Sequence, residues 1–451
     1  MTNSGENICS VTPGLWKRLQ GDGVGAILAR GASASFVVAV VGAVMAFGTN
    51  VLLARLMGAT QYGIYIYVLT WINLLAIVCH LGLKTSLLRY IPTYNAKQDW
   101  PLFRGILGHS VQYVVLASLI VSVIVAFIVW FIKDRIGIEH AVTFWIALFL
   151  LPLLGVTGLR QAVLRSLKYI FKSGLPDSFF RPMMIIVLSS SFYFYTHENL
   201  QATYAMGINL IGAIVSFIIG TVWLLKVLPE QLSHAQPKYS DREWLMVSLP
   251  LFFMSGMTLI QNNTDIIMIG LMLDTEQAGV YAIASRIAGL IVFGLTAANT
   301  IVAPMISELY STGQYQKLQR MITLAARGIG LFTLIISISM AIVGEYMLGL
   351  FGDEFVNGYV PLLILIAGQM INAFAGSVGF LMTMTGHHMQ AAKIVGVSAL
   401  LNIFANAMLI PVFGLMGAAI ATATTTVIWN LMMLVYVWRK MSINPTILAR
   451  I

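Results

Sequence analysis

The chain is poor in charge. Only 10% of its 451 residues are Asp, Glu, Lys or Arg, whereas 59% are hydrophobic and the mean hydropathy is +0.86. A water-soluble domain usually has about 25% charged residues, because water must solvate its surface. The shortage therefore excludes an ordinary soluble globular protein.

Cysteine is also scarce. The two cysteines are Cys9, in the polar N-terminal stretch, and Cys79, in an apolar run, so a disulfide between them is not expected. No Cys or His spacing is typical of a metal site, and no paired carboxylates, activated nucleophile or glycine-rich phosphate loop stands in a suitable context. We therefore expect no catalytic residue, no metal and no cofactor, and we predict that the protein is not an enzyme.

Long apolar runs occupy most of residues 32–438. There are about twelve of them, and a helix of roughly 20 apolar residues crosses the ~30 Å hydrocarbon core of a bilayer. The sequence thus predicts an all-α polytopic membrane protein of about twelve transmembrane helices. The fifth span is the shortest, and Phe179, Phe180 and Arg181 extend it toward the membrane surface. We place the spans at 32–54, 63–83, 111–132, 141–159, 182–195, 204–227, 245–272, 278–306, 328–351, 360–385, 395–413 and 416–438.

Lys and Arg are distributed unevenly over the predicted loops. With a cytoplasmic N-terminus, all but four of the 26 Lys and Arg fall on the cytoplasmic side; Arg55, Lys133 and Arg135 fall outside, and Arg286 lies within a span. Cytoplasmic loops retain basic residues, so we expect both termini in the cytoplasm and the chain in the cell (inner) membrane. Topology and anionic lipid explain the net charge of +9, and no nucleic-acid partner is expected.

The two halves of the chain resemble each other. At an offset of 215 residues Asn50 falls opposite Asp265, and after one inserted residue the offset becomes 216. Identical pairs at these two offsets include Thr49 and Thr264, Met57 and Met272, Gly63 and Gly279, Tyr65 and Tyr281, Tyr94 and Tyr310, and Arg104 and Arg320. Each half holds about six spans, an even number, so the halves have the same orientation and an axis along the membrane normal relates them.

The chain accordingly divides into five segments. They are a cytoplasmic N-terminal segment (1–31), a first six-helix half (32–227), a cytoplasmic linker (228–244), a second six-helix half (245–438) and a cytoplasmic tail (439–451). The linker contains Pro229, Pro237 and charges of both signs, as expected of a connection between two bundles. Two parallel halves around a central cavity are the architecture of alternating-access transporters.

Several short motifs resemble those of a known family. They are ARLMGATQYGIY at 54–65, its counterpart at 265–281, LRSLK at 164–168 followed by Arg181-Pro182, and PVFGLMGAA at 411–419. Together they resemble the polysaccharide-export flippases, the O-antigen type among them, of the multidrug/oligosaccharidyl-lipid/polysaccharide (MOP) superfamily. The resemblance covers nearly the whole chain.

The resemblance implies a flippase that moves an undecaprenyl-diphosphate-linked oligosaccharide from the cytoplasmic to the outer leaflet. Such a step serves the assembly of O-antigen (a part of lipopolysaccharide), capsule or exopolysaccharide. The lipid tail stays in the bilayer, whereas the sugar and diphosphate need a polar groove between the halves. The expected partners are this lipid-linked glycan and membrane lipid. Polysaccharide polymerase components are a further candidate partner, and a monomer is expected.

Charge inside a span is costly and by default functional, which draws attention to Asp265 and Arg286. Counted from the span ends at ~1.5 Å per residue, both lie roughly 10 Å below the outer surface. Three interpretations of Arg286 stay open. It contacts the diphosphate, it forms an ion pair with Asp265 that fastens two helices together, or it reaches toward the membrane surface without a ligand.

Amides within the spans are a weaker signal. Gln261 and Asp265 share one helix face, which Asn262 widens, and Asn402 and Asn406 repeat the i, i+4 spacing in the eleventh span. Such side chains commonly bond neighbouring helices, so both helix packing and substrate contact stay open. The candidate substrate-binding residues are Arg286, Asp265, Asn50, Gln261, Asn262, Arg181, Asn402 and Asn406.

Three other functions also stay open. A multidrug antiporter of the same superfamily would share the layout but favour an acidic cavity for organic cations, whereas Asn50 is neutral and Arg286 adds positive charge. A polymerase or glycosyltransferase usually carries a sizeable outer loop with catalytic carboxylates, and the longest outer segments here, 133–140 and 196–201, are short. A scaffold without transport activity is compatible with the same fold.

Overall fold

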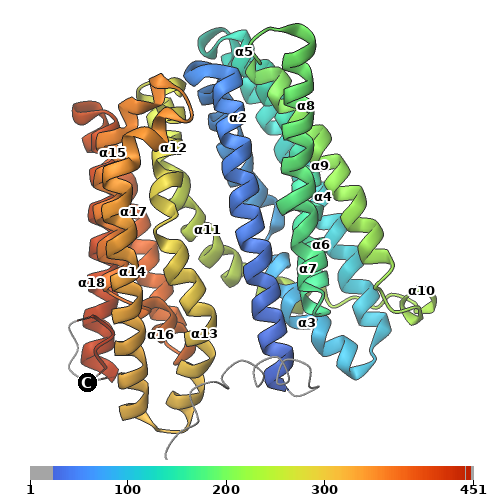
Figure 1. Cartoon of the computed structure of the whole chain (residues 1–451). Coiled ribbons are helices and arrows are strands. Elements are labelled where there is room, and N and C mark those ends of the chain that lie inside the picture. Colours follow the sequence, from blue (N-terminus) through green and yellow to red (C-terminus); the bar gives the residue numbers. More distant parts are fainter. Residues whose placement is uncertain (1–23, 442, 448–451) are drawn as a thin grey trace, which may run out of the picture.

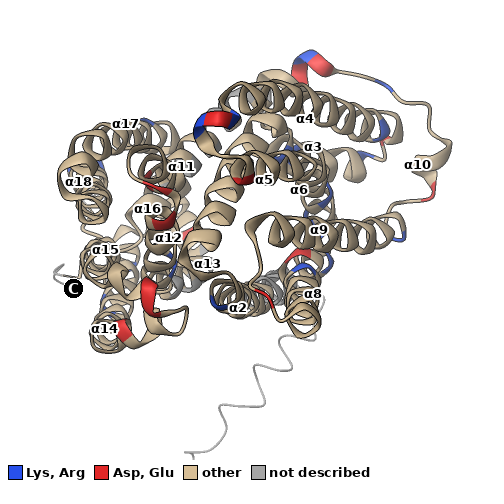
Figure 2. Ribbon diagram, turned by 90° about the horizontal axis from the view of Figure 1, so that it is seen from above, with Lys and Arg blue, Asp and Glu red and all other residues tan. Residues whose placement is uncertain are grey.

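The computed structural model describes residues 24–441 and 443–447. Within these residues the chain forms helices and turns and no β-strand. The helices gather in two bundles that lie side by side, helices α2–α9 in the first and α11–α18 in the second (Figure 1). Seen from above, the charged residues lie mostly at helix ends and in loops (Figure 2). The predicted all-α membrane protein with two halves is confirmed.

The first bundle begins with the longest helix. Its helices are α2 (Val24–His80), α3 (Leu83–Lys97), α4 (Trp100–Ile136), α5 (Ile138–Leu148), α6 (Leu150–Ser166), α7 (Ile170–Leu175), α8 (Arg181–Thr196) and α9 (Ala202–Leu225). The first predicted span and most of the second lie in α2, and the non-helical residue between them is Gly58, with φ 71° and ψ 171°. Glycine suits this kink because it adopts positive φ without a Cβ clash. A π-helical turn, η1 (Pro176–Phe180), joins α7 to α8, so the fifth span is longer than the predicted 182–195.

The second bundle comprises α11 (Asp241–Met272), α12 (Thr275–Gly289), α13 (Val292–Ser311), α14 (Tyr315–Gly349), α15 (Tyr359–Phe374), α16 (Val378–Met384), α17 (His388–Phe413) and α18 (Leu415–Met441), with a 3-10 helix, η2 (Asp353–Gly358), before α15. Three predicted spans are each divided between two helices: 141–159 between α5 and α6, 278–306 between α12 and α13, and 360–385 between α15 and α16.

Eight helical stretches of the described residues are long and apolar enough to cross a membrane. One of them, Val37–His80, covers two predicted spans. Every predicted span overlaps a helix. A multi-pass membrane protein is therefore shown, and the count of twelve crossings stays a prediction. Most of the predicted N-terminal segment lies outside the described residues, as do residues 448–451 of the tail.

The bundles contact each other at the end of the molecule that contains Gly58 and η2, which we call the kink end. A Cβ added to Gly279 of α12 would lie 2.8 Å from the Cα of Gly63 in α2. The Thr60 hydroxyl donates to Glu276 across the same contact, at 2.6 Å. Both pairs are separated by 216 residues, the offset of the internal repeat. Equivalent residues can touch only beside the axis that relates their halves, so the axis passes between α2 and α12.

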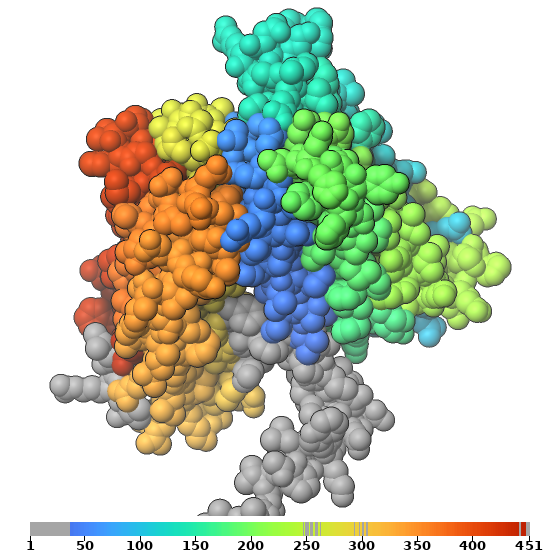
Figure 3. Space-filling view, turned by 45° about the horizontal axis from the view of Figure 1, so that its top comes forward, coloured from blue at the N-terminus to red at the C-terminus, as the bar shows by residue number. Residues whose placement is uncertain are grey.

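Two further contacts join the two bundles at the kink end. Arg55 of α2 donates hydrogen bonds to the carbonyls of Gly349 and Leu350 at 2.8 and 2.7 Å. A carboxylate oxygen of Glu354 accepts the backbone N–H of Ala59 at 2.7 Å, next to the kink. The space-filling view shows the two bundles in direct contact around this part of α2 (Figure 3).

Helix α11 connects the bundles. Near its start, the Trp244 indole donates to the Tyr94 hydroxyl at 3.0 Å, and the hydroxyls of Ser248 and Ser86 lie 2.7 Å apart, so this part packs on α3 of the first bundle. Its other end belongs to the second bundle. The connection between α9 and α11 contains the short helix α10 (Gln231–His234), and we call this end of the molecule the linker end.

Candidate substrate-binding site

A cavity lies between the two bundles. One part, about 460 Å³, is lined by α2, α8 and α9 of the first bundle and by α12 of the second. A second part, about 570 Å³, shares Asn73, Asp177 and Arg181 with the first and extends along α3, α6 and α11. Together they form the central cavity, and the predicted cavity between the halves is confirmed.

Arg181 lines both parts of the central cavity. It is the first residue of α8, directly after the π-helical turn, and such turns change the direction of the side chains that follow them. Its Nε donates to the amide oxygen of Asn209 at 3.0 Å, and the amide nitrogen of Asn209 donates to the Tyr65 hydroxyl at 2.9 Å. Helices α8, α9 and α2 thus hold the guanidinium at the cavity.

Arg286 reaches the cavity from the opposite bundle. It lies on α12, and its guanidinium donates to the amide oxygen of Asn50 and, at 3.3 Å, to the Tyr62 hydroxyl. Tyr62 also donates to Asn50, at 2.9 Å. Two predicted site residues, Arg286 and Asn50, therefore meet across the boundary between the bundles. The interpretation that Arg286 reaches toward the membrane surface is wrong, because it bonds α2.

Among the described residues of this cavity, the carboxylate is Asp177, and it is already neutralised. Asp177, in the π-helical turn, accepts from Arg160 at 2.7 Å, from Gln161 at 2.9 Å and from the Ser216 hydroxyl at 2.7 Å. Arg160 is only 3% exposed, so its charge serves this ion pair. Among the described residues, neither Arg181 nor Arg286 has a carboxylate within the 4.0 Å of an ion pair. The central cavity therefore carries unneutralised positive charge.

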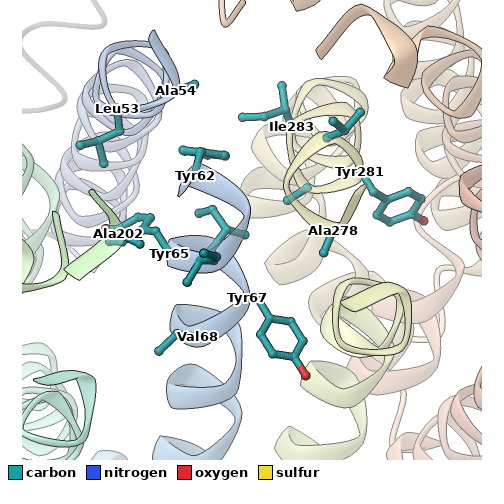
Figure 4. Packing of buried hydrophobic residues seen from close by; sticks show 14 of the residues in the cluster. Leu53, Ala54, Tyr62, Tyr65, Tyr67, Val68, Ala202, Ala278, Tyr281 and Ile283 are labelled. Carbon is teal, nitrogen blue, oxygen red and sulfur yellow. The ribbon is translucent and has the colours of Figure 1, made fainter. Parts of the chain in front are cut away.

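The interpretation in which Arg286 forms an ion pair with Asp265 is wrong. Asp265 accepts hydrogen bonds from the Tyr281 hydroxyl at 2.7 Å, from Thr422 at 2.5 Å and from the Asn406 amide at 2.8 Å. Tyr281 and Arg286 lie five residues apart on α12, which places them about 140° apart around the helix. Tyr281 therefore extends into the second bundle, away from α2, as Figure 4 shows, whereas Arg286 meets the first bundle.

The remaining predicted residues belong to the second bundle. Asn402 donates to Thr422 and Thr425 at 3.1 and 3.2 Å and so joins the hydrogen bonds around Asp265. Gln261 makes a long contact, 3.5 Å, with the Ser398 hydroxyl. The side chain of Asn262 lies outside the described part of the chain. The structure thus brings Asp265, Asn402 and Asn406 together, separately from Arg286, Asn50 and Arg181.

The sequence analysis missed several residues of the central cavity. Tyr65 and Asn209 orient Arg181, and Lys84 and His80 line the part next to α3. Tyr65 carried a usable signal, because the repeat matches it with Tyr281. No group of three His, Cys, Asp or Glu side chains is placed to hold a metal ion within the described residues.

The geometry is suited to an anion with several oxygen atoms. Guanidinium groups bind phosphate oxygens through charge-assisted and often bidentate hydrogen bonds. Two such groups line one cavity from opposite bundles, so an anion in that cavity would meet positive charge from both bundles. A relative motion of the bundles would change the distance between them.

Comparison with known proteins gives the family. The model of the family described as polysaccharide biosynthesis protein matches residues 28–310, more than half of the chain. The chain belongs to this polysaccharide biosynthesis family. A curated relative of this family member is the probable low-salt glycan biosynthesis flippase Agl15 of Haloferax volcanii, 23% identical over 404 residues that cover 88% of this chain and 80% of Agl15.

Solved structures show the fold of the family member. An inward-facing multidrug resistance MATE family transporter of the MOP superfamily superimposes with a TM-score of 0.71 at 13% identity, covering 89% of this chain and 94% of that one. The lipid II flippase MurJ in an inward closed conformation gives 0.69 at 14% identity, with 89% and 86% covered. The chain therefore has the fold of these two transport proteins.

Proposed function

We propose that this protein is a flippase that moves an undecaprenyl-diphosphate-linked oligosaccharide from the cytoplasmic to the outer leaflet by alternating access. The product would serve O-antigen, capsule or exopolysaccharide assembly. The observation that carries the proposal is the pair of arginines, Arg181 and Arg286, that line one cavity from opposite bundles without a carboxylate partner. A diphosphate offers the acceptors that such a pair binds. The flippase names of Agl15 and MurJ support the same assignment.

The surroundings of the cavity fit a lipid-linked substrate. Hydrocarbon excludes the sugar and diphosphate, whereas the tail is at home in it. Helix α4 presents apolar side chains outward, among them Val123, Phe127 and Phe131, each more than half exposed, which suits contact with lipid. A substrate with its head in the cavity and its tail among the lipids is compatible with both surfaces.

We place the linker end in the cytoplasm, because basic residues concentrate in the loops of that side. The contacts of Arg55, Gly63 and Glu354 at the kink end then close the central cavity toward the outside. Transport would require these contacts to break while the linker ends of the two bundles approach each other. The cell (inner) membrane, a monomeric state and a polymerase partner belong to this proposal.

The alternative is a multidrug cation antiporter, which the likeness to the MATE transporter supports. The charge of the site favours the flippase. Organic cations would meet Arg181 and Arg286, and Asp177, the carboxylate that lines this cavity, is bonded to Arg160. Asp265, the buried carboxylate of the second bundle, is bonded by three neutral donors.

The test is a leaflet assay in reconstituted vesicles with a fluorescent undecaprenyl-diphosphate sugar. Arg286→Ala and Arg181→Ala should each slow flipping by about 10- to 100-fold, because a hydrogen bond to a charged group contributes about 1.5–3 kcal/mol. Arg286→Lys should keep part of the activity, since lysine retains the charge but loses the bidentate geometry. The matched control is Arg320→Ala, which removes an exposed arginine of α14 and should flip normally.

Normal flipping by both alanine variants would contradict the proposal. So would a preparation that transports organic cations and leaves the fluorescent lipid in its original leaflet, which would favour the antiporter. Size-exclusion profiles identical to the wild type would show that slow variants are still folded.

A further inference from the structure

The second bundle contains a cavity of its own. It measures about 440 Å³ and lies among α13, α15, α16, α17 and α18. Among the described residues, its lining contains no Lys, Arg, Asp, Glu or His. We call it the neutral cavity. Its volume is within the range of pockets that hold small ligands.

The neutral cavity is the counterpart of the charged part of the central cavity. At the repeat offset of 216 residues, His80 of the central cavity falls on Thr296 of the neutral cavity, and Ala76 falls on Val292. The two halves therefore hold equivalent cavities. Among the described residues, charged groups such as Lys84 and Arg181 line that of the first half and not the neutral cavity. A duplicated cavity that has no charge is suited to a different chemical group.

Two buried amide oxygens of the neutral cavity lack a hydrogen-bond donor among the described residues. They belong to Asn299 and Asn430, whose side chains are only 5% and 2% exposed. The orientation of the Asn430 amide is set by its own donors, which bond the side chain of Asn372 and the carbonyl of Thr426, both at 2.9 Å. Unpaired buried acceptors are costly, so a ligand that supplies hydrogen-bond donors would be stabilised here.

We propose that the neutral cavity binds an uncharged, hydroxyl-rich group, the sugar portion of the lipid-linked glycan. The identity of the ligand rests on the proposed function above, whereas the cavity and its unpaired acceptors do not. Sugar hydroxyls are donors that match the oxygens of Asn299 and Asn430, and Trp429 lines the same cavity with an aromatic surface on which a sugar ring packs. A hydrocarbon tail would leave both oxygens unpaired.

A substitution at Gly379 would fill the neutral cavity without changing Asn299 or Asn430. It lines the cavity in α16, and the nearest atom to a Cβ added there is the Met433 sulfur at 3.8 Å, so Gly379→Leu places its side chain in open space. The matched control is Gly328→Leu in α14 of the same bundle. That glycine is exposed and has no heavy atom within 4 Å of an added Cβ.

The experiment compares two probes, farnesyl diphosphate and farnesyl diphosphate carrying N-acetylglucosamine, on the purified full chain in lipid nanodiscs. The wild type and Gly328→Leu should bind the sugar-bearing probe at least tenfold more tightly than the sugar-free probe. Gly379→Leu should bind both probes with the affinity of the sugar-free one. A cysteine at Thr383, which lines the neutral cavity, should be protected from a maleimide by the sugar-bearing probe and not by the sugar-free one.

The outcomes separate this inference from the proposed function. Equal protection of the cysteine by both probes would assign the cavity to the hydrocarbon tail and overturn the inference. Flipping of lipid-linked sugar with no protection by either probe would also overturn it and leave the proposed function intact. If neither farnesyl probe binds but dodecyl maltoside protects the cysteine while tetradecyl phosphocholine does not, the sugar site holds and the flippase assignment fails.

Discussion

The two bundles have equivalent tyrosines, but the hydrogen-bond networks that these tyrosines join carry charges of opposite sign. In the first bundle, Arg181 bonds Asn209, which bonds Tyr65. In the second bundle, Tyr281, the repeat partner of Tyr65, bonds Asp265. A tyrosine hydroxyl thus anchors a hydrogen-bond network in each half, and the charged residue of that network is an arginine in one half and an aspartate in the other.

The correspondence extends to the next helix. Asn209 and Thr422 each stand seven residues after the first residue of their helices, α9 and α18, and each bonds the network of its own bundle. The accessibility of the charges differs. Arg181 lines the central cavity, whereas Asp265 is 5% exposed and lines neither part of it. The repeat therefore retains the positions of polar groups, and one half uses its charge at the cavity while the other uses it to hold four helices together.

The two bundles can be compared in this way only if they have the same orientation in the membrane. Labelling of single cysteines from outside tests this orientation, because each cysteine either reacts or does not. Cysteines introduced singly at Gln201 and Asp353, exposed at the kink end of the first and second bundle, should react with an impermeant thiol reagent from outside intact cells. Cysteines at Gln236 and Gln314, exposed at the linker end, should not. Labelling of Gln236 alone from outside would give the first half an odd number of spans and end the comparison.

Removal of Asp265 and removal of Arg181 should have different effects on the stability of the protein. Asp265→Ala deprives Tyr281, Thr422 and Asn406 of their acceptor, and each unpaired buried donor costs about 1–3 kcal/mol, so a loss of about 3 kcal/mol or more is expected. Arg181→Ala frees one acceptor, on Asn209, and should change the stability far less while it slows flipping. Thermal unfolding in detergent measures both. Equal shifts in the two variants would mean that the charges have the same role.

The contact between the bundles should respond to a single methyl group. Gly279→Ala places a Cβ 2.8 Å from the Cα of Gly63, which is backbone and cannot rotate away. Overpacking of this kind costs about 1–3 kcal/mol and should favour separation of the bundles at the kink end. Spin labels at Gln201 and Asp353 would report a longer distance. Gly289→Ala, on the same helix with no heavy atom within 4 Å of the new Cβ, is the control and should leave the distance unchanged.

Much of the fold could be predicted because apolar runs and basic loops are linear features of the sequence. The repeat even placed Gly63 opposite Gly279, which touch in the structure. The positions of the helix breaks were harder to predict from the sequence. Leu81, directly after α2, adopts φ 49° although it is not a glycine. Tertiary packing, which no local pattern encodes, decides such breaks.

The site was predictable in part. Arg286 and Arg181 stood out because charge within or beside an apolar run is rare. The pairing of Asp265 with Arg286 was wrong, because estimated depth says nothing about direction around a helix, and Tyr281 is the residue of α12 that faces Asp265. Asp177 was missed because its π-helical turn lay outside the predicted fifth span.

The central claim is that Arg181 and Arg286 together hold a diphosphate between the bundles. Equilibrium binding of a fluorescent undecaprenyl diphosphate to the wild type and to the double variant Arg181→Ala/Arg286→Ala tests it most directly. The account predicts at least a hundredfold loss of affinity in the double variant, because each charged hydrogen bond contributes about 1.5–3 kcal/mol. An affinity equal to that of the wild type would contradict it.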